Sequence, residues 1–354
     1  MRTFVATLLF VAIACAAHAK CTFKIQGDNA IFEGCNVVVR NGTGSTTIPN
    51  GLGNVIVGYN EPSTSAGAVP RAGSHNVVVG AGNGYGATSG IVAGTENQIL
   101  GDGASILGGA ENIAAGYHAT VAGGRQNRAA GDYAAVGGGQ YGRAMGPAST
   151  VTGGWDNGAT GPFTTASGGG DNTAWGYRAG AFGGTQNVAS GQDSTTLGGQ
   201  FNAAGGVAAI ACGGKENSAG GEASAVLGGA DNDANGPRSI VAGGTGGQGS
   251  GELATVAGGD TNEAAGYMSA AFGGYGNTAE AQSTATVGGA RNDASGDQCL
   301  VAGGQRNTCS GALSVVSGGE RNQASGYGAA VSGGLNRSAA GDDDWAAGAL
   351  TQDN

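Results

Sequence analysis

Few residues in this chain of 354 could carry out acid–base, nucleophilic or metal chemistry. Apart from His18 in the apolar N-terminal segment, the histidines are His75, in an irregular region, and His118, at a variable position. A catalytic triad or a metal cluster needs several such side chains in one place, and two histidines in these positions assemble neither. We therefore expect no catalytic residue, no metal ligand, no cofactor and no enzymatic activity, and we interpret both histidines as surface residues.

Glycine pairs and one acidic run are the remaining candidates for ligand chemistry. The pairs are not phosphate-binding loops, because no helix follows to receive the phosphate at its N-terminus. They also lack the Asp of the calcium-binding nonapeptide roll. Asp342, Asp343 and Asp344 could bind Ca²⁺ weakly. We favour a solvated acidic end that blocks stacking.

The chain places its side chains through a fifteen-residue repeat, which runs sixteen times from Gly101 to Ala340 without insertion or deletion. Its consensus is G-x-x-[A/S/T]-x-[V/A]-x-G-G-x-x-N-x-A-x. The glycine pair at places eight and nine occurs in all sixteen units, and Asn at place twelve occurs in thirteen. The Asn column is interrupted at Gly142, Gly247 and Arg337. The repeat defines columns whose contents indicate the fold.

This period predicts an all-β fold, a parallel β-solenoid or β-roll of about 16 to 18 coils. Helical hairpin repeats of about 34 residues and propeller blades of about 40 are too long to fit. Each interior Gly costs a helix about 1 kcal/mol relative to Ala. Solenoid corners instead need φ > 0 or a close backbone approach that a Cβ would block. Sixteen coils with strands about 4.8 Å apart would form a rod of roughly 75 Å.

We expect places four, six, twelve and fourteen to point inward, with the glycines at corners and the other places outward. The interior is then thin, so stability must come from the backbone ladder and from stacked identical side chains, including an Asn column. The segment from Gly86 to Leu100 reads as already in register, with Ser89 and Ile91 at places four and six.

An apolar run from Phe4 to Ala17, followed by Ala17-His18-Ala19, predicts a secretory signal peptide over residues 1–19. The mature chain would begin at Lys20 and be secreted, extracellular or at a cell surface. A lipoprotein with Cys15 as its lipidated residue is the weaker alternative.

The remaining chain divides by its regularity. Residues 20–52 are expected to form an N-terminal cap, because exposed solenoid ends are sticky. Residues 53–100 form irregular first coils with an excursion loop over Tyr59–Ser74. Residues 101–340 form the sixteen regular coils, and residues 341–354 form the acidic end.

Two pairs of cysteines are disulfide candidates. Cys21 and Cys35 bracket a short segment, as expected for a staple in an oxidising compartment. Cys299 and Cys309 occupy inward places four and fourteen of one unit. They would bridge the thin core if their Cβ atoms lie about 3.5 to 4.5 Å apart, and the alternative is two buried thiols acting as small apolar residues. Cys212, at an outward place, could link chains or remain an exposed thiol.

Composition and charge restrict the partners. A net charge of −10 argues against nucleic acid, and no apolar run after the signal approaches the roughly 20 residues of a membrane span. The 77 glycines and 11% charged residues would indicate disorder without the strict period. Sequons at Asn41 and Asn336 would permit N-glycosylation in a eukaryotic source.

The outward places five and seven carry large apolar residues among Ala, Ser and Thr. An exposed apolar stripe usually marks an interface, and a rod with one such stripe could close into a cyclic homo-oligomer. The interface candidates are Phe182, Leu197, Ile210, Leu227, Ile240, Phe272 and Leu300.

Two ligand-binding alternatives use the outward surface of a monomer. An ice-binding face needs a Thr-x-Thr array, and only Thr150 and Thr152 provide one. A glycan-binding surface could use aromatic rings, although these do not fall in adjacent coils of one column: Tyr117, Tyr177, Tyr267 and Tyr327 at place two, with Trp155 and Trp175 elsewhere.

Units such as Ser314-Val-Val-Ser-Gly-Gly-Glu-Arg-Asn322-Gln-Ala-Ser-Gly-Tyr resemble the head repeats of trimeric autotransporter adhesins. The resemblance covers roughly Gly86 to Ala340. It implies a left-handed parallel β-roll, packing as a trimer, and adhesion to extracellular matrix or a cell-surface ligand. The family's usual repeat is shorter, and this sequence shows neither a coiled-coil stalk nor a C-terminal barrel anchor. Residues 50–61 and 73–80 also look like the start of uncharacterised secreted repeat proteins, from which no activity carries over.

The sequence thus favours a secreted structural or adhesive rod that acts through a repetitive surface and self-association, with a trimer expected. A monomeric solenoid that binds glycan or ice is the alternative.

Overall fold

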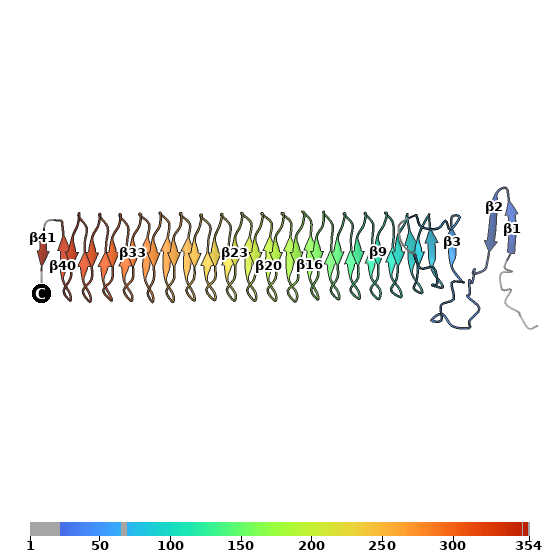
Figure 1. Ribbon diagram of the computed structural model, residues 1–354, viewed down its shortest axis with the longest axis horizontal. Helices are drawn as coiled ribbons and strands as arrows, with labels where there is room; N and C mark the ends of the chain where they lie inside the picture. The colour runs from blue at the N-terminus through green and yellow to red at the C-terminus, as the bar shows by residue number, and fades with distance from the viewer. Residues whose placement is uncertain (1–21, 65–68, 349, 353–354) are drawn as a thin grey trace, which may run out of the picture.

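The computed structural model describes residues 22–64, 69–348 and 350–352. These residues form a long rod of about 18 solenoid turns, and no helix occurs among them (Figure 1). The predicted all-β parallel solenoid is confirmed. The expected signal peptide, Lys20 and Cys21 lie outside the described residues.

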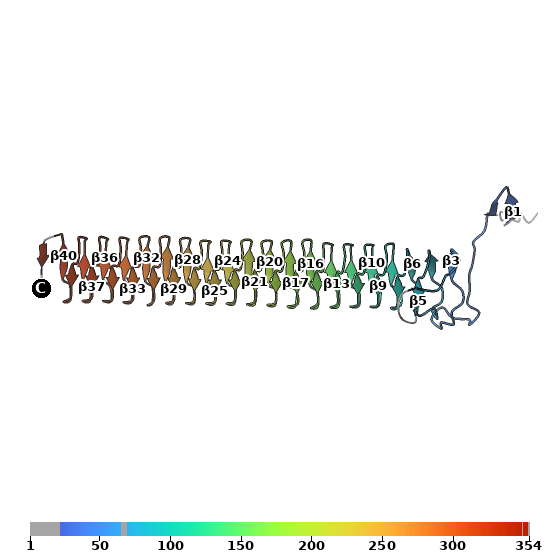
Figure 2. The same cartoon turned by 45° about the horizontal axis from the view of Figure 1, so that its top comes forward.

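Each regular turn contributes one short strand to each of two parallel sheets, which are visible as two rows of arrows in Figure 2. The first sheet is built from places five to seven. Its strands are β3 (Val55–Val57), β4 (Val77–Val79), β6 (Ile91–Ala93), β8 (Ser105–Ile106), β10 (Thr120–Val121), β12 (Ala135–Val136), β14 (Thr150–Val151), β16 (Thr165–Ser167), β18 (Gly180–Phe182), β20 (Thr195–Leu197), β22 (Ile210–Cys212), β24 (Ala225–Val226), β26 (Ile240–Val241), β28 (Thr255–Ala257), β30 (Ala270–Phe272), β32 (Ala285–Val287), β34 (Leu300–Val301), β36 (Val315–Val316), β38 (Ala330–Val331) and β40 (Trp345–Ala347).

The second sheet is built from places thirteen and fourteen, and its strands also pair in parallel from turn to turn. They are β5 (Gly84–Tyr85), β7 (Gln98–Ile99), β9 (Ile113–Ala114), β11 (Arg128–Ala129), β13 (Arg143–Ala144), β15 (Gly158–Ala159), β17 (Thr173–Ala174), β19 (Val188–Ala189), β21 (Ala203–Ala204), β23 (Ser218–Ala219), β25 (Asp233–Ala234), β27 (Gln248–Gly249), β29 (Glu263–Ala264), β31 (Thr278–Ala279), β33 (Asp293–Ala294), β35 (Thr308–Cys309), β37 (Gln323–Ala324) and β39 (Ser338–Ala339).

The corners between the sheets are also hydrogen-bonded from turn to turn. Single parallel bridges join place-ten residues, as between Ala110 and Arg125. At place three the Tyr133 N–H donates to the Tyr117 carbonyl oxygen at 2.7 Å. At place eleven the Gln126 N–H donates to the Ala110 carbonyl oxygen at 3.0 Å. The ladder therefore continues around the turn beyond the strands.

The predicted inward places are confirmed by burial. In one turn, Ala119, Val121, Asn127 and Ala129 are all almost fully inaccessible to solvent. Because most inward side chains are Ala, Ser, Thr, Val or Asn, the two sheets lie close together and each turn buries little apolar surface. Backbone pairing between turns is accordingly a large share of what holds the rod together.

One register prediction is wrong. Ser89 and Ile91 are exposed, and Val92 is the buried residue that pairs with inward Ile106. This pairing is offset by fourteen residues, because the turn carries a single glycine, Gly94, where later turns carry two. The shorter corner shifts the preceding strand by one position, which moves its side chains to the opposite face.

The Asn column forms the ladder expected from the sequence. The Asn202 Nδ2 donates to the carbonyl oxygens of Gly198 at 3.0 Å and Gly214 at 3.2 Å. Its Oδ1 accepts the Asn217 N–H at 3.1 Å. Each amide thus satisfies backbone groups in its own turn and in the next, which otherwise would be buried without partners.

The glycine at place nine has two reasons to be glycine. Gly124 has φ of +86°, and a Cβ there would lie 2.1 Å from the Gly139 carbonyl oxygen. Places three and eleven also have positive φ, yet non-glycine residues such as His118 and Tyr141 occupy them in most turns. Sequence reasoning placed such conformations only at glycines. The corner hydrogen bonds hold these residues in the left-handed region.

The two ends of the rod differ. At the N-terminal end β1 (Thr22–Gln26) and β2 (Asn29–Glu33) form an antiparallel hairpin that extends away from the first turn (Figure 1). Ile56, an inward residue of the first turn, remains 38% exposed, whereas its neighbour Val78 is 1% exposed. A capping role for residues 20–52 therefore stays a prediction.

At the C-terminal end, β40 pairs antiparallel with β41 (Leu350–Gln352). This reversed strand occupies the edge of the first sheet that a further parallel turn would use. Two of the acidic residues here act locally as acceptors, since Asp342 Oδ1 accepts the Tyr327 N–H at 3.1 Å and Asp344 Oδ2 accepts the Gly341 N–H at 2.6 Å.

Candidate functional site

The structure places the two histidines of the coils in different surroundings. His118 packs against Tyr117 and Tyr133, with ring centroids 4.0 and 5.8 Å away. His75 lines a small cleft beside Arg40 and Asn41, and its Nδ1 is buried without a hydrogen-bond partner. In the part of the chain that the structure describes, no three His, Cys, Asp or Glu residues gather closely enough to hold a metal ion.

The cysteines of the described turns are free thiols. Cys299 and Cys309 are both buried, and the predicted bridge between them is not formed. Instead the Cys299 Sγ lies 3.0 Å from the Cys309 carbonyl oxygen, and the Cys309 Sγ lies 2.9 Å from Ser314 Oγ. Hydrogen bonding between the thiols, together with burial, raises the pKa of Cys299 far above its usual range. The alternative of two small buried side chains fits this geometry, whereas a bridge between Cys21 and Cys35 stays a prediction.

The outward face of the first sheet carries an apolar stripe, which small and hydroxyl-bearing residues interrupt from β10 to β16. Phe182, Leu197 and Cys212 are neighbours in one row, because β18, β20 and β22 pair in register. The row includes strongly exposed side chains, such as Leu197 at 47% and Leu227 at 55%. Of the seven interface candidates only Leu300 is half-buried, and the others are exposed: Phe182, Leu197, Ile210, Leu227, Ile240 and Phe272.

The stripe extends beyond the regular repeats. Val55, Val57, Val77 and Val79 on the outer face of β3 and β4 are exposed, as is Ile91 of β6. The row therefore follows the first sheet from its first strand. Sequence reasoning identified only the part that lies within the regular units.

The Thr-x-Thr pair is isolated in the structure as well as in the sequence. Thr152 Oγ1 lies 2.8 Å from Ser167 Oγ in the next turn, so one of its hydroxyl interactions is already made within the rod. The neighbouring outward residues are Ala135 and Gly137 in the turn before, and Thr165 and Ser167 in the turn after, so no second Thr-x-Thr pair adjoins it.

At one corner, aromatic side chains from different places of the repeat are in contact across successive turns. Tyr117 at place two contacts Tyr133 at place three of the next turn, with ring centroids 5.6 Å apart. Phe163 contacts Tyr177 in the same way at 5.6 Å, and the Arg178 guanidinium lies over the Tyr177 ring. Places two and three are neighbours across turns, so reading each column alone misses these pairs. They form two separate clusters rather than one platform.

A cleft of about 520 Å³ lies along the opposite corner, beside the outer face of the second sheet. Three groups of side chains line it: aromatic Tyr141 and Trp155, basic Arg128 and Arg143, and the polar or acidic residues Glu111, Gln126, Asn127 and Asp156, with Ile113 at one end. The Tyr141 and Trp155 rings meet edge to face, with centroids 6.4 Å apart and planes at 88°.

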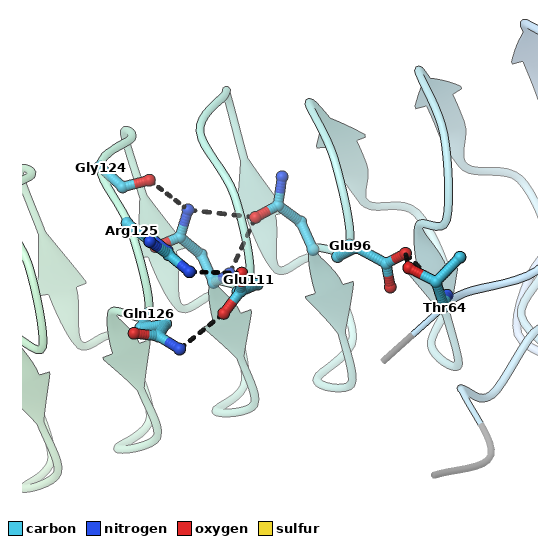
Figure 3. A network of polar contacts seen from close by, with 8 residues as sticks. Thr64, Glu96, Glu111, Gly124, Arg125 and Gln126 are labelled. Atoms are coloured by element: carbon cyan, nitrogen blue, oxygen red, sulfur yellow. Dashed lines mark hydrogen bonds and ion pairs between the residues drawn. The ribbon is translucent and has the colours of Figure 1, made fainter. Parts of the chain in front are cut away.

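Ion pairs fix both ends of this cleft. Glu111 Oε1 lies 3.0 Å from Arg125 Nη2, and its Oε2 accepts a hydrogen bond of 2.6 Å from Gln126 Nε2 (Figure 3). At the other end Arg143 Nη2 lies 2.7 Å from Asp156 Oδ1. Sequence reasoning did not find the cleft, because its walls come from places ten to thirteen of four successive turns. The one available signal was the presence of two Arg in adjacent units at place thirteen.

The excursion loop is attached to the rod near this region. Thr64 N–H and Oγ1 donate to Glu96 Oε1 at 2.8 and 2.9 Å (Figure 3). Arg71 Nη1 donates to the Asn60 carbonyl oxygen at 2.9 Å. The contacts of Thr64 hold the described part of the loop against an early turn, and the contact of Arg71 joins two parts of the loop.

The two sequons differ in access. Asn41 is 6% exposed, its Nδ2 donates to the Ile48 carbonyl oxygen at 2.7 Å, and its Oδ1 accepts from Thr43. Asn336 is exposed at a place-eleven corner. In the folded rod only the Asn336 side chain has space for a glycan.

Among residues 22–64, 69–348 and 350–352 there is no helix of the length and apolarity that crossing a bilayer requires. A comparison with protein-family models found no match to this chain, and a comparison with curated proteins found none either. The rod, its apolar stripe and its cleft are therefore the features that bear on function.

Proposed function

We propose that this protein is a secreted structural or adhesive rod that associates side by side with copies of itself through the outer face of the first sheet. The supporting observation is the apolar stripe, in which exposed Val, Ile, Leu and Phe side chains recur on β3 to β8 and again from β18 to β32, with small and hydroxyl-bearing residues on the four turns between. Contiguous exposed apolar patches of this kind commonly mark protein interfaces.

The stripe is also shaped for side-by-side packing. Gly180 at place five leaves room for Phe182, since a Cβ on Gly180 would lie 2.4 Å from the Phe182 ring. The Phe182 ring can therefore lie flat over the strand, so that it protrudes little from the outer face of the sheet. A flat stripe parallel to the long axis allows rods to align side by side. Three copies, each using the same stripe, would form a closed cyclic oligomer with no unused interface, which is the trimer that we expect.

The proposed activity is mechanical and adhesive rather than enzymatic. The two carboxylates that line the cleft, Glu111 and Asp156, are three turns apart, which is roughly 14 Å at about 4.8 Å per turn. Glycoside hydrolysis uses carboxyl pairs about 5 to 10 Å apart. Both carboxylates are also engaged in ion pairs. These contacts favour binding over cleavage, with matrix or cell-surface ligands as the partners.

Light scattering coupled to size exclusion tests the proposal on the secreted full chain. Phe182→Glu/Leu197→Glu places two charges on adjacent strands of the stripe and should give monomers, while the wild-type chain forms trimers. Thr173→Glu/Val188→Glu is the matched control, because these residues face outward on adjacent strands of the second sheet in the same region. A wild-type chain that stays monomeric at all concentrations would contradict self-association, and would favour the alternative of a monomeric ligand-binding solenoid.

A further inference from the structure

The cleft beside the second sheet differs in charge from the rest of that face. Arg128 and Arg143 are the only basic residues at place thirteen in the sixteen units, whereas the later turns carry Asp233, Glu263 and Asp293 there. The whole chain has a net charge of −10. A paired basic site on an acidic rod is a local feature, not a property of the repeat.

The two arginines lie directly opposite each other in the ladder between β11 and β13. Like charges in that position are destabilising. Asp156 compensates Arg143 at 2.7 Å, but among the described residues Arg128 makes no ion pair. An anionic group placed between the two guanidinium groups would remove the repulsion and could accept hydrogen bonds in a bidentate arrangement.

The aromatic wall lies next to this basic pair. Trp155 is 53% exposed, and its edge-to-face contact with Tyr141 fixes the orientation of both rings. Exposed rings of this kind stack on the C–H faces of pyranose sugars. The same cleft holds a further hydrogen-bonding group, because Gln126 Oε1 is buried without a partner. Aromatic faces beside fixed polar groups are the chemistry of a saccharide site.

We propose that this cleft binds an acidic saccharide. Its ring stacks on Trp155, and its carboxylate is held by Arg128 and Arg143. An acidic peptide fits less well, because Ile113 is the only aliphatic side chain in the lining and no apolar subsite for peptide side chains is present there.

The site does not depend on self-association. The cleft borders the outer face of the second sheet, and the stripe covers the outer face of the first, with the core between them. A chain that fails to trimerise can therefore still bind the saccharide, and the two proposals fail separately.

Calorimetry and tryptophan fluorescence of the full chain with tetragalacturonate as the probe test the inference. Saturable binding is expected for the acid, and about tenfold weaker binding for its methyl ester, which has the same rings without the charges. Arg128→Ala and Trp155→Ala should each weaken binding of the acid about tenfold, by loss of a charge-assisted hydrogen bond and of ring stacking.

Arg291→Ala is the matched control, because Arg291 also lies beside an aromatic ring, that of Tyr275, but outside the cleft. This variant should bind tetragalacturonate as the wild type does. Circular dichroism should show that every variant keeps the solenoid. Three results would each overturn the proposal: no saturable binding of tetragalacturonate, equal binding of the methyl ester, or equal losses in Arg291→Ala and Arg128→Ala. Tetraglutamate binding as tightly as the sugar, without any effect of Trp155→Ala, would assign the cleft to an acidic peptide instead.

Discussion

At the scale of single residues, the inward asparagines are the polar side chains on which the rod most depends. Each one joins backbone groups of two turns, as Asn202 does for Gly198 and Gly214. Where Gly142 interrupts the column, its N–H still donates to Asn127 Oδ1 at 2.8 Å, but it offers no side chain to the following turn. The chain therefore tolerates isolated losses from the column, at a local cost.

Asn202→Ala should destabilise the rod by about 3 kcal/mol, because the buried Asn217 N–H loses its acceptor and two carbonyl oxygens lose a donor. The solenoid should persist, as it does around Gly142. Urea unfolding followed by circular dichroism measures the loss, and faster hydrogen exchange of the Asn217 amide locates it. Asn235→Ala, at an exposed outward place, is the control and should change neither. Equal stability of the two variants would refute the role assigned to the column.

At the scale of the element, one turn is specified by its corners more than by its strands. Many strands are only two residues long, and their side chains are small. The corners contain a glycine at place nine and left-handed residues at places three and eleven. A left-handed non-glycine residue costs roughly 1 to 2 kcal/mol. The hydrogen bonds between corners of successive turns offset this cost.

The two glycines of one pair should respond differently to substitution. Gly124→Ala should destabilise the rod by more than about 1 to 2 kcal/mol, because φ is positive there and the new Cβ would overlap the Gly139 carbonyl oxygen. Gly123→Ala should have little effect, since a Cβ at Gly123 meets nothing within 4 Å. Thermal unfolding of both variants beside the wild type measures the difference. A similar shift of the melting temperature in both variants would contradict the difference that the structure assigns to the two glycines.

The period and the column contents were enough to predict the solenoid, the inward places and the Asn ladder, because each depends only on which residues recur. The register near Ile91 was missed, since a single missing residue at Gly94 moves a strand without disturbing the later columns. The contact of Tyr117 with Tyr133 and the cleft around Trp155 were missed for a related reason. They join different places of successive turns, and column statistics carry no information about such neighbours.

At the scale of the whole molecule, a cysteine on the outer face of the first sheet can report whether the rods assemble. Cys212 lies in the apolar stripe beside Leu197 and is half-buried, and burial raises the pKa of its thiol. Cys299 and Cys309 are buried in the core and should not react in the folded rod.

Alkylation of Cys212 should slow as the protein concentration rises, because the proposed interface covers the stripe. Mass spectrometry of the labelled peptide measures the rate. In Phe182→Glu, two turns away from the thiol, the rate should be independent of concentration. Concentration-independent labelling of the wild type would place the stripe outside any interface.

Because every turn of the regular region pairs with its neighbours at a fixed offset of fifteen residues, distance along the rod is proportional to residue number. Each unit adds a rise of about 4.8 Å. Duplicating one unit between Gly101 and Ala340 would move every feature on its far side by one rise and would keep the stripe and the cleft on their own faces. The chain is in this sense a molecular ruler, in which the spacing between two surface sites is encoded by counting repeats.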